Sequence, residues 1–278
     1  MNNQYNYIDT LITNKVTLII PLYNKVYHIE KTLQSVKDII KYDNFECIVI
    51  DDESTDGSSE IAWNFCKENK DTFKYVKIQH EGGRNPANAR NVGIKLANSE
   101  YICFLDADDI LLSDYITRGV NHFNILNIDI YIENTIVIDN NYPDPILWLD
   151  TQEFPKDLIK TKEILLSNMF PYFGGCLYKT SIVKKYNFKD YQSEDMLFLG
   201  NYLFHTNNAY TNIEETAMQY NIIYSEQNKI NEDPNEKFWI TRIVNYLNEL
   251  NDNKYYYKVD YYTDENNNNC WQLVENNI

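Results

Sequence analysis

Several features that would indicate particular protein classes are missing from this sequence. Its longest mainly apolar runs, such as residues 16–22, are far shorter than the ~18–20 residues of a membrane-spanning helix. Residues 1–14 contain no cationic segment followed by a long apolar core, so we expect no secretory signal. The five cysteines are scattered and form no Cys-x-x-Cys pair, which favours reduced, buried thiols in a cytoplasmic protein.

Basic residues are also scarce. The chain has 25 lysines and arginines against 41 acidic residues, giving a formal net charge of -16. This balance disfavours binding of nucleic acid or an anionic membrane through a broad basic face. It is compatible with an acidic site that binds nucleotides through a metal ion. We therefore expect no nucleic-acid partner and a cytoplasmic location, with peripheral membrane association as an alternative.

Strands and helices alternate along the first half of the chain. Apolar β-rich runs at residues 16–22, 45–50, 73–78 and 100–105 are separated by segments with helical spacing. This alternation predicts an α/β fold with a mostly parallel sheet flanked by helices. Further on, residues 238–250 have the pattern of an amphipathic helix. Two β-rich runs around an Asn-rich loop then predict a hairpin near the C-terminus.

Acidic residues follow the predicted strand 101–105. Asp106, Asp108 and Asp109 come directly after this apolar run. If the chain stays extended, Asp106 and Asp108 point the same way, because side chains alternate along a strand. Two converging carboxylates can hold a hard divalent cation together with phosphate oxygens and water. The alternative interpretation is a solvated acidic turn.

Polar residues also follow the first two predicted strands. Tyr23 and Asn24 come after the first strand, and Asp51 and Asp52 end the second. In open α/β sheets, ligands bind at the carboxyl ends of the strands, at a topological switch point. We therefore expect these residues and the acidic residues after strand 101–105 to meet at one edge of the sheet.

The chain resembles family 2 glycosyltransferases of the GT-A fold. The first four matching segments cover about residues 15–120 and are together highly specific, whereas the fifth is weaker alone. The resemblance thins through 127–169 and stops near residue 230. The matching segments are Val16-Thr-Leu-Ile-Ile-Pro-Leu-Tyr-Asn24, Cys47-Ile-Val-Ile-Asp-Asp-Glu-Ser-Thr-Asp-Gly-Ser58, Ala89-Arg-Asn-Val-Gly-Ile94, Tyr101-Ile-Cys-Phe-Leu-Asp-Ala-Asp-Asp109 and Ser193-Glu-Asp195.

The resemblance implies a domain organisation. Residues 15–230 would form one GT-A domain, with a Rossmann-like nucleotide-sugar-binding half at 15–126 and an acceptor half at 127–230. Residues 1–14 would be a polar lead-in. Residues 231–278 would form an appendage of one helix and a β-hairpin.

The resemblance also implies an activity: transfer of a sugar from a nucleotide-diphosphate donor, with UDP favoured, to a hydroxyl of a glycan or other acceptor, with inversion. Mn²⁺ or Mg²⁺ would assist the reaction. The implied donor-binding residues are Pro21 and Tyr23 at the base, Asp52 on a uracil N–H, Arg90 at the diphosphate or supporting the donor loop, and Asp106 at the ribose and metal shell. Asp108 would be the principal metal ligand.

Asp195 is the implied general base, and Glu194 would orient the helix or an acceptor hydroxyl. Asp195 lies in the first turn of a predicted helix, where we expect the helix dipole to keep its carboxylate ionised. The alternative is that this acidic pair only caps the helix. Phe170, Tyr172 and Phe173 are candidates for a surface that stacks on an acceptor sugar, with core packing as an equal alternative.

Two other functions remain alternatives. A nucleotidyltransferase shares parallel sheets and acidic metal sites, but it would ordinarily have a glycine-rich, basic phosphate loop after the first strand. The residues Pro21-Leu-Tyr-Asn24 do not form such a loop. The second alternative is a catalytically inactive GT-A-like module that binds sugars or assembles with partners. The intact acidic positions argue against it.

Overall fold

The computed structural model describes most of the chain between residues 16 and 222 and two strands near the C-terminus. The predicted lead-in 1–14 and the predicted helix 238–250 lie outside the described residues. The division into a domain and an appendage therefore stays a prediction. The described ranges are 16–41, 43–79, 86–139, 144–149, 151–152, 154–166, 171–189 and 194–222, together with the backbone of 255–263 and 269–277.

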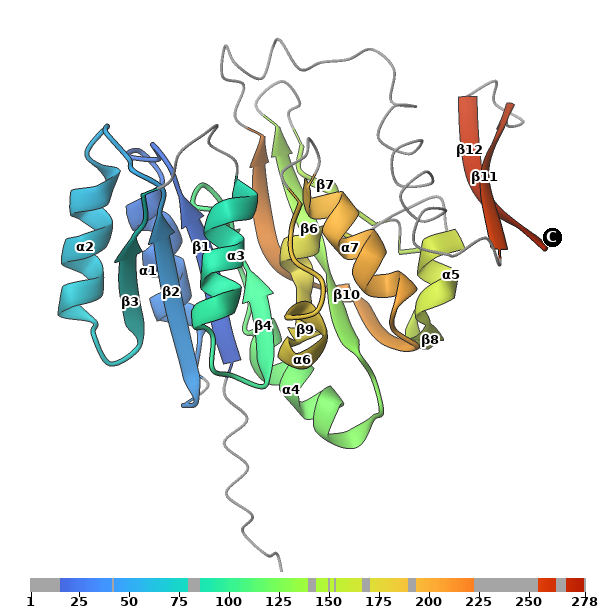
Figure 1. The fold of residues 1–278 in the computed structure, drawn as a ribbon, viewed down its shortest axis with the longest axis horizontal. Helices are drawn as coiled ribbons and strands as arrows, with labels where there is room; N and C mark the ends of the chain where they lie inside the picture. Colours follow the sequence, from blue (N-terminus) through green and yellow to red (C-terminus); the bar gives the residue numbers. More distant parts are fainter. Residues whose placement is uncertain are drawn as a thin grey trace, which may run out of the picture.

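The first half alternates strands and helices, as predicted. Its four strands pair in parallel in the order β3-β2-β1-β4, so the chain reverses direction across the sheet after β3. Helices lie against both faces of this sheet (Figure 1). The elements are β1 (Val16–Leu22), α1 (Ile29–Ile39), β2 (Phe45–Asp51), α2 (Ser58–Glu68), β3 (Phe73–Lys77), α3 (Pro86–Leu96) and β4 (Tyr101–Phe104).

The second half extends the same sheet with mixed pairing. In the described part of the chain the sheet has ten strands, in the order β3-β2-β1-β4-β9-β6-β10-β5, with β7 beside β6 and β8 beside β10. The added elements are β5 (Ile110–Leu111), α4 (Tyr115–Ile125), β6 (Ile130–Asp139), β7 (Ile146–Leu147), β8 (Asp157–Lys160), α5 (Thr161–Leu166), a 3₁₀ turn (Phe173–Gly175), β9 (Cys176–Lys179), α6 (Thr180–Val183), α7 (Glu194–Phe204) and β10 (Asn208–Ile222).

Parallel pairing dominates because β6 and β10 also run in parallel, over most of their length. Strand β9 pairs antiparallel with both β4 and β6, so it joins the two parallel parts into one sheet. The mixed, mostly parallel sheet flanked by helices that the sequence predicted is confirmed.

Strand β1 is central and entirely buried, as expected of an apolar run covered on both faces. The strand runs to Leu22 despite the proline at position 21, and Pro21 pairs with Ile50 of β2. On the other side, pairing with β4 stops at Ile19 and Phe104. The missing N–H of Pro21 therefore leaves no ladder bond unmade, which is why proline is tolerated here.

The predicted C-terminal hairpin is present. Strands β11 (Tyr255–Thr263) and β12 (Asn269–Asn277) pair antiparallel and form a separate two-stranded sheet. Four cysteines, Cys47, Cys66, Cys103 and Cys176, are buried free thiols, which confirms that part of the prediction. No helix in the described residues is long and apolar enough to cross a membrane.

Candidate active site

The ends of β1, β2 and β4 lie side by side, and they carry the polar residues that the sequence singled out. The backbone N–H of Asp52 donates to the carbonyl oxygen of Leu22 at 2.8 Å, which links the end of β2 to that of β1. The N–H of Leu105 donates to Ile19 at 3.1 Å, which links the end of β4 to β1 from the other side. The predicted meeting of strand ends is therefore confirmed.

Two loops leave β1 and β2 in unusual backbone conformations. Asn24 has a φ of 51° and Glu53 a φ of 58°, both in the left-handed region that few non-glycine residues adopt. The loops hold each other: the Asn24 N–H donates to the Ser54 hydroxyl at 3.1 Å, and the Thr55 N–H donates to Asn24 Oδ1 at 2.8 Å. The side chain of Tyr23 stands beside this junction and is 38% exposed.

The carboxylates at the end of β2 are buried. Burial disfavours the charged form of Asp51, but hydrogen bonds from Ser54, Ser59 and Tyr75 outweigh it and lower the pKa of this carboxyl below its usual value. Asp51 therefore fixes the loop that follows β2. Asp52, the predicted base contact, is only 3% exposed and lies next to Leu22 of β1.

The acidic residues after β4 form a turn rather than a continuation of the strand. Strand β4 ends at Phe104, and the Asp109 N–H donates to the Asp106 carbonyl oxygen at 3.0 Å. Strand alternation therefore does not extend to Asp106 and Asp108, and their convergence on one cation stays a prediction. Asp106 and Asp109 instead share the Tyr172 hydroxyl, at 3.4 and 3.0 Å.

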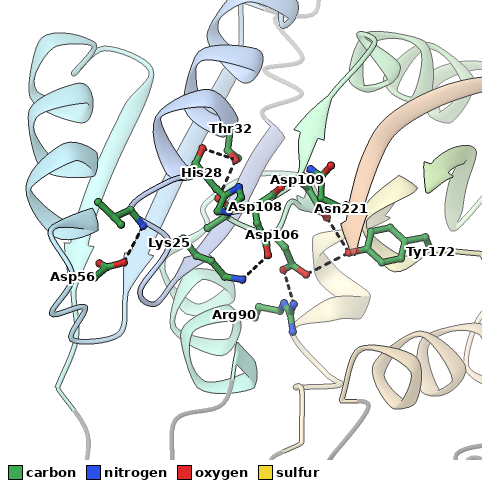
Figure 2. A network of polar contacts seen from close by, with 12 residues as sticks. Lys25, His28, Thr32, Asp56, Arg90, Asp106, Asp108, Asp109, Tyr172 and Asn221 are labelled. Carbon is green, nitrogen blue, oxygen red and sulfur yellow. Dashed lines mark hydrogen bonds and ion pairs between the residues drawn. The ribbon is translucent and has the colours of Figure 1, made fainter. Parts of the chain in front are cut away.

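Residues from two distant elements, α1 and β10, hold this acidic turn, residues 106–109 (Figure 2). Thr32 of α1 donates its hydroxyl to the Ala107 carbonyl oxygen at 3.0 Å. Asn221 of β10 donates its side-chain amide to the Asp108 carbonyl oxygen at 2.6 Å and its N–H to Asp109 at 3.0 Å. The turn is thus a supported structure, and the alternative of a simple solvated acidic turn is wrong.

Asp109 is the most deeply buried carboxyl of the turn. Burial raises its pKa well above the usual value, and the nearby charges of Asp106 and Asp108 raise it further. The hydrogen bonds from Asn221 and Tyr172 oppose this shift without cancelling it. Asp109 therefore supports the turn from inside, while Asp106 and Asp108 are the more exposed carboxylates.

Arg90 of α3 joins the acidic turn to the start of α7. Its guanidinium donates from Nη2 to Asp106 and from Nη1 to Glu194, each at 2.6 Å. The side chain is 2% exposed, and its charged group lies 4.6 Å from the Phe173 ring and 5.3 Å from the Phe188 ring. Arg90 is therefore a buried bridge between two carboxylates. Its predicted role, at the donor diphosphate or in support of the donor loop, stays a prediction.

Glu194 and Asp195 begin α7, as predicted. Burial is the largest influence on both carboxyls and raises the pKa of each, while the positive charge of Arg90 opposes the shift. Desolvation therefore opposes the effect expected of the helix dipole, and an ionised Asp195 stays a prediction. A raised pKa suits a group that must take up a proton near neutral pH.

Lys25 contacts the acidic turn from the opposite side. Its Nζ lies 2.5 Å from Asp108 Oδ2. This residue was absent from the sequence-based site, as was Asn221. Lys25 could have been suspected from its position one residue after Tyr23-Asn24 at a strand end. No sequence pattern indicates Asn221, which lies 113 residues from Asp108.

The donor set of the acidic turn fits a hard divalent cation. No three His, Cys, Asp or Glu side chains of the described residues form a complete metal cluster. Asp108 nevertheless already stabilises one cation, the Lys25 ammonium, and carboxylate oxygens are the ligands that Mg²⁺ and Mn²⁺ prefer. Such a site would leave most of the coordination shell to phosphate and water oxygens.

Aromatic rings border the acidic turn on the side of β10. Tyr172 lies 4.8 Å from Tyr220 and 5.4 Å from Trp148, measured between ring centroids. Tyr172 is buried and donates its hydroxyl to Asp109, whereas Tyr220 and Trp148 are partly exposed. Phe173 packs against Arg90 and Phe104 in the core. The predicted sugar-stacking role of Tyr172 and Phe173 stays a prediction, and Phe170 lies outside the described residues. Tyr220 and Trp148 are better exposed for such a role.

Comparison with known proteins gives the chain its family. Residues 17–187 match the profile of Glycosyl transferase family 2. An uncharacterised glycosyltransferase of Rickettsia bellii is 44% identical over 98 residues, which are 34% of this chain and 13% of that protein. Poly(ribitol-phosphate) β-N-acetylglucosaminyltransferase TarP of Staphylococcus aureus is 27% identical over 200 residues, covering 70% of this chain and 59% of TarP.

Solved structures show the same fold. The S. aureus TarS 1–349 complex with UDP-GlcNAc superposes with a TM-score of 0.62 at 19% identity, covering 76% of this chain and 60% of that one. The sheet described above is thus that of GT-A glycosyltransferases. The chain spans only 13–17% of the length of three similar Rickettsia glycosyltransferases. The match over residues 17–187 nevertheless covers more than half of this chain, which therefore belongs to glycosyl transferase family 2.

Proposed function

We propose that the protein transfers a sugar from a UDP-sugar to an acceptor hydroxyl with inversion at the anomeric carbon. The observation that carries the proposal is the link made by Arg90. It brings Asp106, at the donor-side strand ends, and Glu194, beside the candidate base, onto one guanidinium. The carboxylates for donor binding and for proton transfer therefore lie in one site.

The donor would bind at the ends of β1 and β2. The half-exposed ring of Tyr23 offers a face for the base, and buried Pro21 lines the strand end beneath it. Asp52 would accept a hydrogen bond from the uracil N–H, since a carboxylate is an acceptor and that group is a donor. TarS 1–349 was solved in complex with UDP-GlcNAc, so this nucleotide sugar is the first donor to test.

Asp108, with Asp106 beside it, would hold the divalent cation. A bound Mn²⁺ or Mg²⁺ neutralises charge that develops on a departing diphosphate. The chain itself supplies the carboxylates, and Thr32 and Asn221 hold the shape of the acidic turn. Arg90 would keep its ion pairs with Asp106 and Glu194, so its charge would neutralise these two carboxylates rather than the donor.

Asp195 would act as the general base. As the acceptor oxygen attacks the anomeric carbon, the carbon–oxygen bond to the diphosphate breaks and the hydroxyl proton moves to Asp195. Removing such a base typically costs ~10²–10⁴-fold in rate. Its raised pKa lies closer to neutrality than that of a solvated aspartate, which favours proton uptake.

The test is a panel of nucleotide sugars, UDP-GlcNAc first, incubated with Mn²⁺ and assayed for transfer and for slow donor hydrolysis. Asp195→Asn should keep UDP binding and lose turnover, and Asp108→Ala should lose the metal-dependent part of UDP binding. Asp71→Asn, an exposed aspartate between α2 and β3, is the matched control and should change neither.

Three outcomes would contradict parts of the proposal. Unchanged turnover of Asp195→Asn would remove the base assignment. Equal UDP affinity with Mn²⁺ and with EDTA would remove the metal assignment. Tight UDP binding without turnover of any donor would favour an inactive binding module, and release of the sugar 1-phosphate would favour nucleotidyl transfer.

A further inference from the structure

Hydrogen bonds hold the backbone at Lys25, whereas its long side chain can change conformation. Its carbonyl oxygen accepts the N–H groups of His28 and Ile29, both at 3.0 Å, at the start of α1. The next N–H, of Val26, donates to Asp56 at 2.9 Å. The loop is therefore fixed on both sides of Lys25, and only its flexible four-carbon side chain carries the ammonium to Asp108.

Among the described residues, Lys25 and Arg90 bring positive charge to the acidic turn (Figure 2). They differ in how easily they can leave it. Arg90 is 2% exposed, contacts two carboxylates and packs between two aromatic rings. Lys25 is 35% exposed, and among the described residues it has one carboxylate partner, Asp108, which is 16% exposed. Solvent can replace Lys25 at little cost, because exposed ion pairs contribute little, whereas Arg90 is held in place.

Lys25 thus occupies the carboxylate that the proposed function assigns to the divalent ion. An ammonium 2.5 Å from Asp108 Oδ2 leaves no room for a metal ion at that oxygen. If it leaves, it remains attached to the loop that carries Tyr23. That loop borders the space proposed for the donor, where the diphosphate offers the nearest new negative charge.

We infer that Lys25 is an exchangeable counter-ion, which neutralises Asp108 in the donor-free enzyme, yields that carboxylate to the divalent ion and then pairs with the donor diphosphate. The inference rests on the proposed function and extends it to a residue outside its site. It implies that metal alone binds weakly, because it must displace Lys25. Metal and nucleotide together bind well, because the displaced ammonium gains a new partner, and the coupling is reciprocal.

Lys25→Met tests the inference because methionine keeps a long side chain without the charge. Without nucleotide, Mn²⁺ should bind the variant roughly 10-fold more tightly than the wild type, which corresponds to about 1.4 kcal/mol. With saturating Mn²⁺, UDP should bind the variant roughly 10-fold more weakly, since the diphosphate loses its ammonium partner. Free Mn²⁺ is measured by electron paramagnetic resonance and UDP binding by calorimetry.

The opposite signs of the two changes separate this role from simple damage, which would weaken both. Lys31→Met, an exposed lysine of α1, is the matched control and should change neither affinity. Mn²⁺ affinity of nucleotide-free Lys25→Met within twofold of the wild type would overturn the inference. Asp108→Ala separates the proposed metal site from the proposed role of Lys25. If Asp108→Ala loses metal-dependent UDP binding while Lys25→Met binds Mn²⁺ and UDP like the wild type, the counter-ion role is refuted and the metal site is not. If wild-type UDP binding needs no metal, the proposed metal site fails, whereas the nucleotide-free Mn²⁺ measurement still decides the role of Lys25.

Discussion

Replacing Arg90 by methionine should destabilise the protein by about 2–4 kcal/mol. Removing one member of a buried ion pair typically costs about 3–5 kcal/mol, because the partner charge is left uncompensated. Asp106 and Glu194 are 26% and 14% exposed, so water screens part of that cost. Loss of the contacts with Phe173 and Phe188 adds about 0.5–2 kcal/mol, which the polarizable methionine sulfur partly restores.

The free energy of unfolding is measured by urea denaturation, and a double-mutant cycle with Glu194→Gln isolates the pair. The coupling energy should be about 1–3 kcal/mol, as expected for contacting groups in one network. Lys156→Met provides the comparison: its partner Glu214 is 66% exposed, so this change should cost less than about 1 kcal/mol. Equal losses for the two variants, or a coupling near zero, would refute the buried-bridge argument.

A kinetic consequence is independent of stability. The charge of Arg90 lowers the pKa of Asp195 against the effect of burial, so its removal should raise that pKa further. The acid limb of the rate against pH should therefore move to higher pH in Arg90→Met. A variant that was merely less stable would lose activity without this displacement.

Three further predictions concern other parts of the site. The folded-state pKa of Asp109 is raised, so its contribution to stability is complete below about pH 4 and is lost as pH rises through that raised pKa. Asp109→Asn should therefore gain stability relative to the wild type, by up to about 1.4 kcal/mol per pH unit. Urea denaturation from pH 4 to 8 measures this difference. A parallel pH dependence in both proteins would contradict this. Gly175→Ala places a Cβ 2.8 Å from the Glu133 carbonyl oxygen and should lower the free energy of unfolding by about 1–3 kcal/mol. An unchanged free energy of unfolding would show that the backbone at Gly175 and Glu133 moves apart without cost. Tyr23→Ala should weaken UDP binding roughly 10-fold or more in calorimetry, as loss of one base-stacking ring does, and unchanged affinity would place the base elsewhere.

The donor half of the fold could be predicted because its signals are local. The apolar runs of β1 and β2 are buried on both faces, and α1 buries Ile29, Leu33 and Val36 at helical spacing. The position of Asp52 followed from strand order alone. The order β4-β9-β6-β10-β5 could not be predicted, because it depends on which distant strands pair, and no local pattern encodes that choice.

The sequence could identify many residues of the candidate site, but it could not predict which of them contact one another. Periodicity gave Asp106 and Asp108 a common direction, but β4 ends two residues before Asp106 and a turn takes over. The partner of Arg90 on α7 lies 104 residues away, and that of Lys25 lies 83 residues away. Burial decides the pKa of Asp195, and burial is a property of the packed chain rather than of the first turn of its helix.

The dependence of the acidic turn on Asn221 has a consequence for the order of folding. The strands β1 to β4 join segments close in sequence, so the entropy lost in bringing them together is modest. The bonds from Asn221 to Asp108 and Asp109 close loops of more than 100 residues, and such distant pairings form slowly. In refolding, the donor-half sheet should form first, and nucleotide binding should recover only when β10 joins it. The rate at which UDP binding returns would then report the rate at which β10 joins the sheet.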